Sequence, residues 1–256
     1  MTDRTRDRHP DHDLPGLVLV HGGAHAGDCW DLTVAELRRF APDLEVLAVN
    51  LPGRQGVPGD LMTATFAEWV DSALTQIDGA GLRDVVLVGH SLAGLSVPRM
   101  AAKLGRARVR GMIFIACTVP DQGRAMVDTL VGPLRRYGVW VGRRGKPLKA
   151  PDWFARYLFC NGMTAAQQAF TLARCRPEST SIFLEPADRC DLPDDIPRAW
   201  ILTTRDRAMT PRSQRRSIAA LGGECTVLSV DSGHDVMISE PRWLAEVLIG
   251  HCRLWS

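Results

Sequence analysis

Residues Val85 to Gly94 read Val-Val-Leu-Val-Gly-His-Ser-Leu-Ala-Gly, an apolar run that passes through Gly-x-Ser directly into a helical pattern. The apolar run predicts a buried strand, and the change of periodicity at Ser91 predicts a sharp turn into a helix. This context is typical of a nucleophile elbow, in which the turn holds a serine hydroxyl above the sheet. The flanking residues must be small so that the two backbones can approach, and Gly89 and Ala93 are small. The alternative is an ordinary crossover in which the serine caps the helix.

A second apolar run ends in a glycine loop upstream. Residues Leu17 to Gly23 read Leu-Val-Leu-Val-His-Gly-Gly, which predicts a buried strand followed by a loop. If Ser91 attacks a carbonyl carbon, the tetrahedral intermediate carries a negative oxygen that needs hydrogen-bond donors. We expect the backbone N–H groups of Gly23 and Leu92 to form this oxyanion hole, and one such donor lowers the barrier by about 3–4 kcal/mol. The alternative is a plain loop that needs glycine for its backbone angles.

Two further strands predict the partners of the serine. The apolar runs Trp200 to Thr204 and Cys225 to Val230 are each followed by polar residues, which include Asp206 and His234. Polar residues just beyond the carboxyl ends of parallel strands meet at one edge of the sheet. In the predicted triad, His234 takes the proton of Ser91 and Asp206 orients the histidine.

Other aspartates compete with Asp206 for the role of the acid. Asp121 follows the predicted strand at 111–116, and its carboxylate could also reach the histidine. Asp231 and Asp235 lie beside His234, but adjacent residues in a loop rarely orient one another as a triad requires. We therefore rank Asp206 first and Asp121 second.

This ordered set of residues is similar to that of the α/β-hydrolase superfamily. Within it, the chain resembles the branch that holds plant methylesterases, plant hydroxynitrile lyases and related bacterial esterases, from about residue 15 to the C-terminus. The segments that carry the resemblance are His21 to Trp30, Gly89 to Gly94, Thr204 to Ala208 and Gly233 to Pro241. The resemblance implies the same triad and the same backbone donors. In some hydroxynitrile lyases of this branch a lysine closely follows the histidine, whereas this chain has Asp235 and Val236, which favours ester hydrolysis.

The chain alternates between strand and helix patterns. Strands are expected near 17–20, 45–50, 85–88, 111–116, 199–203 and 224–230. Helices are expected near 30–40, 64–78, 91–104, 211–221 and 241–250, with Pro98 causing a kink or lying in an early turn. This order predicts an α/β fold with a mostly parallel sheet of about six strands and helices on both faces. We expect a flexible tail at 1–14 and a single domain at 15–256.

The alternation stops between residues 121 and 196, where we expect an inserted cap. Trp153 and Phe154, together with Tyr157 and Leu158, have the spacing of one apolar helix face, which predicts packing of the cap on the body. One or two cap aromatics could instead line an apolar substrate pocket. The candidate pocket residues are Ala24, Trp140, Trp153, Phe154 and Tyr157. The basic run at 135–149 is typical of a solvated loop, although it could also steer an anionic substrate.

The composition of the chain indicates which kinds of partner and compartment are expected. The chain has 256 residues, of which 45% are hydrophobic, and a net charge of +2, so nothing in its charge favours a nucleic-acid partner. No apolar run is long enough for a membrane span, and the N-terminus has no apolar core typical of a signal peptide. Seven cysteines without C-x-x-C spacing are typical of reduced thiols in a cytoplasmic protein. We expect a monomer or homodimer.

No cofactor or metal is expected. His21 and His25 are four residues apart, but in a glycine-rich loop rather than on a helix, and no acidic residue follows with zinc spacing.

Three hypotheses for the function of the chain remain. The first is a serine carboxylesterase that cleaves a small or medium, mostly apolar ester through an acyl-enzyme. The second is a lyase or C–C bond cleaving enzyme on the same scaffold. The third is a non-catalytic binding module, which the intact triad disfavours.

Overall fold

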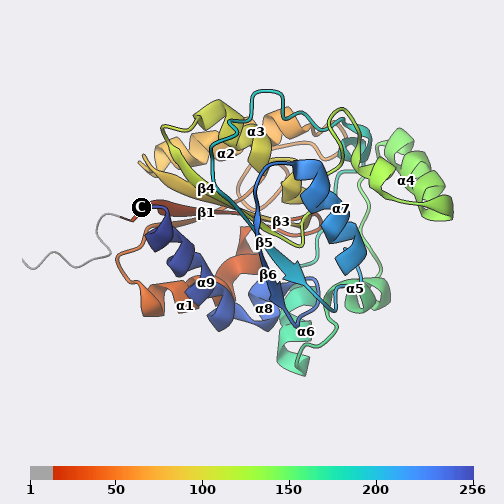
Figure 1. Ribbon diagram of the computed structural model, residues 1–256. Helices are drawn as coiled ribbons and strands as arrows, with labels where there is room; N and C mark the ends of the chain where they lie inside the picture. Colours follow the sequence, from red (N-terminus) through yellow and green to blue (C-terminus); the bar gives the residue numbers. More distant parts are fainter. Residues whose placement is uncertain (1–13) are drawn as a thin grey trace, which may run out of the picture.

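A six-stranded parallel sheet forms the centre of the computed structural model, which describes residues 14–256 (Figure 1). The strand order is β2-β1-β3-β4-β5-β6, and every neighbouring pair is parallel. The strands are β1 (Gly16–Val20), β2 (Val46–Val49), β3 (Val85–His90), β4 (Val109–Ile115), β5 (Arg198–Thr203) and β6 (Thr226–Val230). The predicted sheet is confirmed. The predicted tail lies, apart from Leu14, outside the described residues.

Helices cover both faces of the sheet (Figure 1). The longer helices are α1 (Asp31–Phe40), α2 (Phe66–Gly79), α3 (Val97–Leu104), α4 (Gly132–Arg144), α5 (Asp152–Phe159), α6 (Ala165–Arg174), α7 (Pro211–Leu221) and α9 (Pro241–Leu254). The shorter ones are α8 (Val236–Ser239), η1 (Gly27–Trp30), η2 (Ser91–Gly94), η3 (Met126–Thr129) and η4 (Ser181–Leu184). Helices α2 and α3 lie on one face, and α1, α8 and α9 on the other.

The continuous apolar runs of the sequence are explained by this double coverage. Val18 and Val20 of β1 pack into the cluster that includes α2 and α3, whereas Leu17 and Leu19 pack into the cluster that includes α1 and α9. Successive side chains of a strand point to opposite faces, so a strand covered on both faces must be apolar throughout.

The expected helix at 91–104 is interrupted. A short 3₁₀ turn, η2, begins at Ser91, and α3 begins only at Val97. Pro98 lies in the first turn of α3, where a missing N–H breaks no helical hydrogen bond. The predicted position of Pro98 in an early turn is therefore confirmed.

Helices α4, α5 and α6 lie between β4 and β5 in the chain and at the end of the molecule away from the C-terminus (Figure 1). We propose that they form the cap at 121–196. The predicted packed face of α5 is wrong, because Trp153 is 72% exposed and Tyr157 is 54% exposed. Ala155 is the buried residue of α5, and Phe159 at the carboxyl end of the helix contacts His25 and His234.

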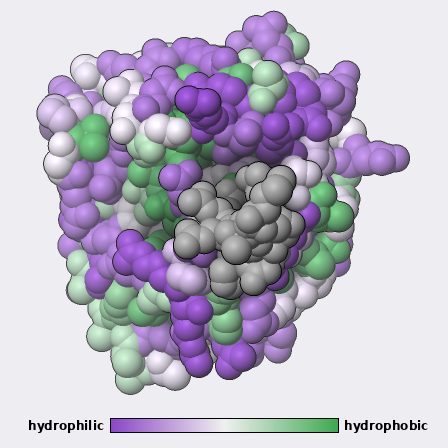
Figure 2. Space-filling model, turned by 90° about the vertical axis from the view of Figure 1, so that its left-hand side faces the viewer, coloured by the Kyte–Doolittle hydropathy of each residue, from purple (hydrophilic) through white to green (hydrophobic). Residues whose placement is uncertain are grey.

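The surface of the molecule is mostly polar on the face that Figure 2 shows. The end of the molecule near the C-terminus is mostly hydrophilic, with apolar residues in small groups (Figure 2). No helix among the described residues is long and apolar enough to cross a membrane. All seven cysteines are free, and five of them are buried.

Candidate active site

Ser91 occupies a strained turn at the carboxyl end of β3. Its φ is +53°, a left-handed value that is uncommon for a residue with a side chain. A Cβ atom on Gly22 would lie 2.8 Å from Cβ of Ser91, and one on Gly89 would lie 2.8 Å from Cγ2 of Val97. A Cβ on Gly94 would clash with the carbonyl oxygen of Thr118. The three glycines around the serine, Gly22, Gly89 and Gly94, are therefore required by close approach.

Ser91, His234 and Asp206 form one hydrogen-bonded chain. Nε2 of His234 lies 3.0 Å from Oγ of Ser91, and Nδ1 lies 2.8 Å from Oδ2 of Asp206. Asp206 and His234 are buried, whereas Ser91 is partly accessible. Asp121 is exposed and makes no hydrogen bond to His234. The geometry therefore favours Asp206 over Asp121 as the acid.

The carboxylate of Asp206 is fixed by its own hydrogen bonds. Oδ1 accepts from the backbone N–H groups of Ala208 and Met209 at 2.8 and 2.7 Å, and Oδ2 accepts from the Thr203 hydroxyl at 2.9 Å. Because these donors stabilise the ionised carboxylate, His234 is held with its Nδ1–H toward Asp206 and its Nε2 lone pair toward Ser91. Burial lowers the pKa of His234, but the charge and hydrogen bond of Asp206 outweigh burial and raise it above its ordinary value.

The glycine loop after β1 faces the elbow. A Cβ on Gly23 would lie 3.4 Å from Cδ2 of Leu92, so the two predicted oxyanion donors belong to neighbouring residues. Ala24 has a φ of +61°, and its N–H donates to Oε2 of Glu178 at 2.8 Å. Glu178 in turn pairs with Arg54 at 2.7 Å. Ala24, predicted to line the pocket, is thus held by a cap residue.

Glu178 and Arg54 are two site residues that no sequence pattern predicted. Both are buried charges that meet across 124 positions of the chain, and neither lies in a recognisable pattern. Buried charges are rare unless they are paired, so only the pairing reveals their role. Together they tie the cap and the segment after β2 to the glycine loop.

Four buried histidines lie in the site, one of which is His234 of the triad, and their partners fix their protonation. Nδ1 of His21 lies 2.8 Å from the carbonyl oxygen of Gly22, and its Nε2 accepts the N–H of Leu51, so the ring is neutral. Burial lowers the pKa of His21 to about 3. Burial likewise lowers the pKa of His90, whose Nε2 lies 3.2 Å from the carbonyl oxygen of His234. His25 and His234 are the other two.

Asp235 does not act as an alternative triad acid. It is fully buried, and its Oδ2 lies 3.2 Å from Nε2 of His25. Potential ligand atoms of His90, His234 and Asp235 lie within 4.8 Å of one another. Both ring nitrogens of His234 already make hydrogen bonds to Ser91 and Asp206, so in this arrangement the ring offers neither nitrogen to a metal ion.

One aromatic residue of α5, its last residue Phe159, lies against the triad. Its ring stacks on His234 with centroids 5.6 Å apart and meets the edge of His25 at 5.5 Å. The predicted pocket aromatics Trp140, Trp153, Phe154 and Tyr157 are all exposed on α4 and α5. The helical spacing of Trp153, Phe154 and Tyr157 did not single out Phe159, which lies at the carboxyl end of α5.

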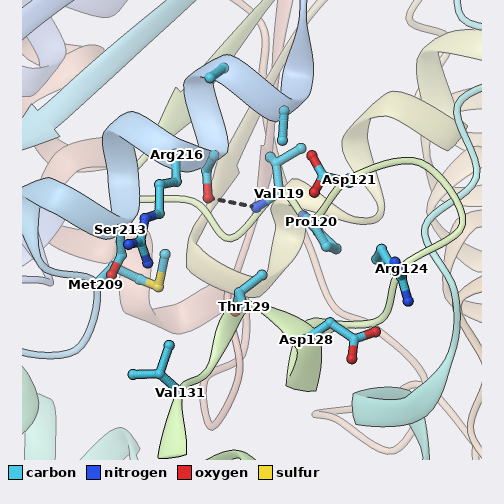
Figure 3. A pocket seen from close by; sticks show the side chains of 13 residues that line it. Val119, Pro120, Asp121, Arg124, Asp128, Thr129, Val131, Met209, Ser213 and Arg216 are labelled. Carbon is cyan, nitrogen blue, oxygen red and sulfur yellow. Dashed lines mark hydrogen bonds between the residues drawn. The ribbon is translucent and has the colours of Figure 1, made fainter.

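A cavity of about 550 Å³ lies between α7 and the segment after β4 (Figure 3). Apolar side chains such as Val119 and Met209 and the charged side chains of Asp121, Arg124 and Arg216 line it. Neither Ser91 nor His234 lines this cavity. It touches the triad through Met209, whose N–H holds Asp206.

Comparison with known proteins agrees with the geometry. A carbendazim hydrolyzing esterase from Nocardioides sp. (strain SG-4G) is 29% identical over 262 residues, covering 92% of this chain and 98% of that protein. Methylesterase 18 of Arabidopsis thaliana is 24% identical over 254 residues, covering 91% and 95% of the two chains. An extracellular alpha/beta-hydrolase from a Paenibacillus species has the same fold, with a TM-score of 0.82 at 20% identity over 93% of this chain and 98% of that chain. The family model described as alpha/beta hydrolase family matches residues 17–247, and the chain therefore belongs to that family.

Proposed function

We propose that this chain hydrolyses carboxylic esters by acyl transfer to Ser91. The observation that carries the proposal is the chain of two hydrogen bonds from Ser91 through His234 to Asp206, at 3.0 and 2.8 Å. The relatives that cover nearly the whole chain are named esterases and methylesterases, which supports the same reaction class.

The reaction has two halves. His234 takes the hydroxyl proton as Oγ of Ser91 bonds to the acyl carbon, and the N–H groups of Gly23 and Leu92 stabilise the oxyanion. The intermediate collapses, and the alcohol leaves with the proton from His234. Water then attacks the acyl-enzyme with His234 again as base, and the carboxylic acid is released. The sum is one ester and one water converted to one acid and one alcohol.

The surroundings of the serine support a small or medium, mostly apolar ester. Phe159 and Leu92 present apolar surface beside His234 and Ser91. Seven free cysteines support a reducing compartment such as the cytoplasm. We keep a monomer or homodimer as part of the proposal. Nothing in the site favours the lyase alternative, since the residue after His234 is an aspartate whose carboxylate faces His25.

A chromogenic short-chain ester tests the mechanism. We expect a burst of alcohol release equal to the enzyme concentration, followed by slower steady turnover, because an acyl-enzyme accumulates. An organophosphonate should add to Ser91, which peptide mass spectrometry locates. Ser91→Ala should abolish both signals while the Tm stays near that of the parent, because the change removes only one hydroxyl from an accessible turn. Retention of most of the activity by this variant would exclude covalent catalysis at Ser91.

A further inference from the structure

A second histidine–carboxylate pair lies directly behind the triad. His25 follows Gly23 by two residues in the glycine loop, and Asp235 follows His234 in the chain. Both side chains are buried, and Nε2 of His25 lies 3.2 Å from Oδ2 of Asp235. The pair therefore joins the loop of one predicted oxyanion donor to the segment that carries the base.

The partners of His25 determine its charge. Nε2 faces the carboxylate of Asp235, and Nδ1 lies 2.8 Å from the carbonyl oxygen of Gly23. Both partners are acceptors, so both ring nitrogens must carry a proton and the ring is cationic. Burial lowers the pKa of His25, but the charge and hydrogen bond of Asp235 outweigh burial and raise it. Burial raises the pKa of Asp235, but the charge of His25 outweighs burial and lowers it.

Several other titratable or charged groups surround this pair. They are His21 in the loop of His25, Asp28 in η1, Arg54 after β2, His90 at the elbow, and His234. Nearby thiols at Cys29, Cys160 and Cys175 have raised pKa values because of burial first and then the charge of Asp235, so they remain neutral.

We propose that His25 and Asp235 form a buried ion pair that positions the oxyanion loop relative to His234. The proposal rests on the proposed esterase function. The Gly23 carbonyl is held by one ring nitrogen and Asp235 by the other, so the imidazolium sets the distance between two segments separated by 210 positions. Both residues are positioning residues, since each acts through its neighbour. Because the oxyanion forms only in the reaction, loss of the pair should lower kcat rather than raise KM.

The first test uses the unmodified protein and does not depend on activity. Nitrogen NMR of ¹⁵N-histidine-labelled protein should show both ring nitrogens of His25 protonated at pH 7, with deprotonation above the ordinary value of about 6.5. A neutral tautomer of His25 at pH 7 would overturn the ion pair. Through-bond assignment identifies the signal without any variant, so a result is obtained even if substitutions unfold the chain.

The second test compares kinetics. We expect His25→Gln to lower kcat by about ten- to a hundred-fold, with KM changed by less than about two-fold, because small misplacements of catalytic groups have effects of this size. The midpoint of its pH profile should rise, since the carboxylate of Asp235 is left uncompensated beside His234. In the double variant His25→Gln/Asp235→Asn the midpoint should return toward that of the parent, and the losses in kcat should not add.

Asp231→Asn is the matched control. Asp231 lies three residues before His234, but its side chain is 77% exposed, so kcat and the pH midpoint should stay near the parent values. The proposal would be overturned if the pH midpoint of His25→Gln equalled that of the parent and if the double variant lost as much kcat as its two changes predict when added. If Ser91→Ala keeps its activity, the proposed function fails, and the NMR result still decides whether the ion pair exists.

Discussion

The backbone conformation and the catalytic partners of Ser91 both depend on other residues. Its positive φ is held by the close contacts of Gly22 and Gly89, both of which leave no room for a side chain. The sequence indicated the elbow because a buried strand, a small residue and a serine occur in order. The left-handed turn therefore follows from local sequence, whereas the partners of Ser91 come from strand ends more than 100 positions away.

Asp206→Asn tests the acid. We expect kcat to fall by about three to four orders of magnitude, because an amide can turn a donor toward His234 and favour the wrong tautomer. Steady-state kinetics with one ester at saturating concentration measures this loss. Asp121→Asn is the control, since Asp121 is exposed at the cavity beside α7, and it should change kcat only slightly. A larger loss for Asp121→Asn would assign the acid to the segment after β4.

The pH profile reports on His234. The histidine must be neutral to accept the proton of Ser91, so kcat/KM should rise with pH through one ionisation and then stay level. The midpoint should lie above the ordinary value of about 6.5, because Asp206 raises the pKa of His234. Initial rates between pH 5 and 9, corrected for spontaneous hydrolysis, measure this midpoint. A profile that falls with pH would exclude His234 as the base.

At the scale of elements, strand positions were predictable and cap contacts were not. Each strand is apolar because both faces of the sheet are covered, so its signal is strong and local. The proposed cap at 121–196 contacts the rest of the chain through single residues, such as Glu178 at the N–H of Ala24 and Phe159 on His234. Such contacts leave no periodic pattern. The spacing in α5 indicated a buried face at residues that are in fact exposed.

Gly94→Ala tests the junction between η2 and the segment after β4. The added Cβ would meet the carbonyl oxygen of Thr118, and Thr118 in turn donates its N–H to the carbonyl oxygen of Ser91. We expect the free energy of unfolding to fall by about 1–3 kcal/mol, as for other overpacked sites, and kcat to fall as well. Gly250→Ala in α9 is the matched control, because nothing lies within 4 Å of its added Cβ. That change should stabilise the protein by about 0.5–1 kcal/mol. Urea unfolding of both variants measures the difference, and equal stabilities would refute the predicted clash.

At the scale of the whole molecule, one regular pattern of the sequence predicted both the fold class and the triad. Strands and helices alternate along the chain, and the serine, acid and histidine each follow a strand in a fixed order. The buried charges were not predictable in this way. Its adjacency to His234 argues against Asp235 as the acid of the triad, yet the same adjacency allows its pair with His25 to connect two parts of the site.

The four buried histidines predict how the stability of the whole chain depends on pH. His21 and His90 have lowered pKa values because of burial, so their contribution is complete above about 6.5, the unfolded value, and is lost as the pH falls. His25 and His234 have raised pKa values, because Asp235 and Asp206 outweigh burial, so their contribution is complete below about 6.5 and is lost as the pH rises. Stability should therefore be greatest near pH 6.5, with slopes on either side of about 1.4 kcal/mol per pH unit for each proton exchanged. The lowered pKa of Asp235 adds a loss only below about pH 4.

Urea unfolding at intervals between pH 5 and 8.5, at constant ionic strength, measures this maximum. Asp235→Asn should move it to higher pH, because His25 then loses the partner that raises its pKa and only His234 still releases a proton above 6.5. Asp231→Asn, which changes an exposed carboxylate of the same segment, should leave the maximum in place. A stability that continued to rise through pH 8 would show that His25 and His234 do not hold raised pKa values in the folded chain. The protonation states assigned to the His25–Asp235 pair and to the His234–Asp206 pair would then both be wrong. The buried carboxylates of Asp235 and Asp206 keep these rings protonated in the folded chain, and this is what makes the stability decline above about pH 6.5.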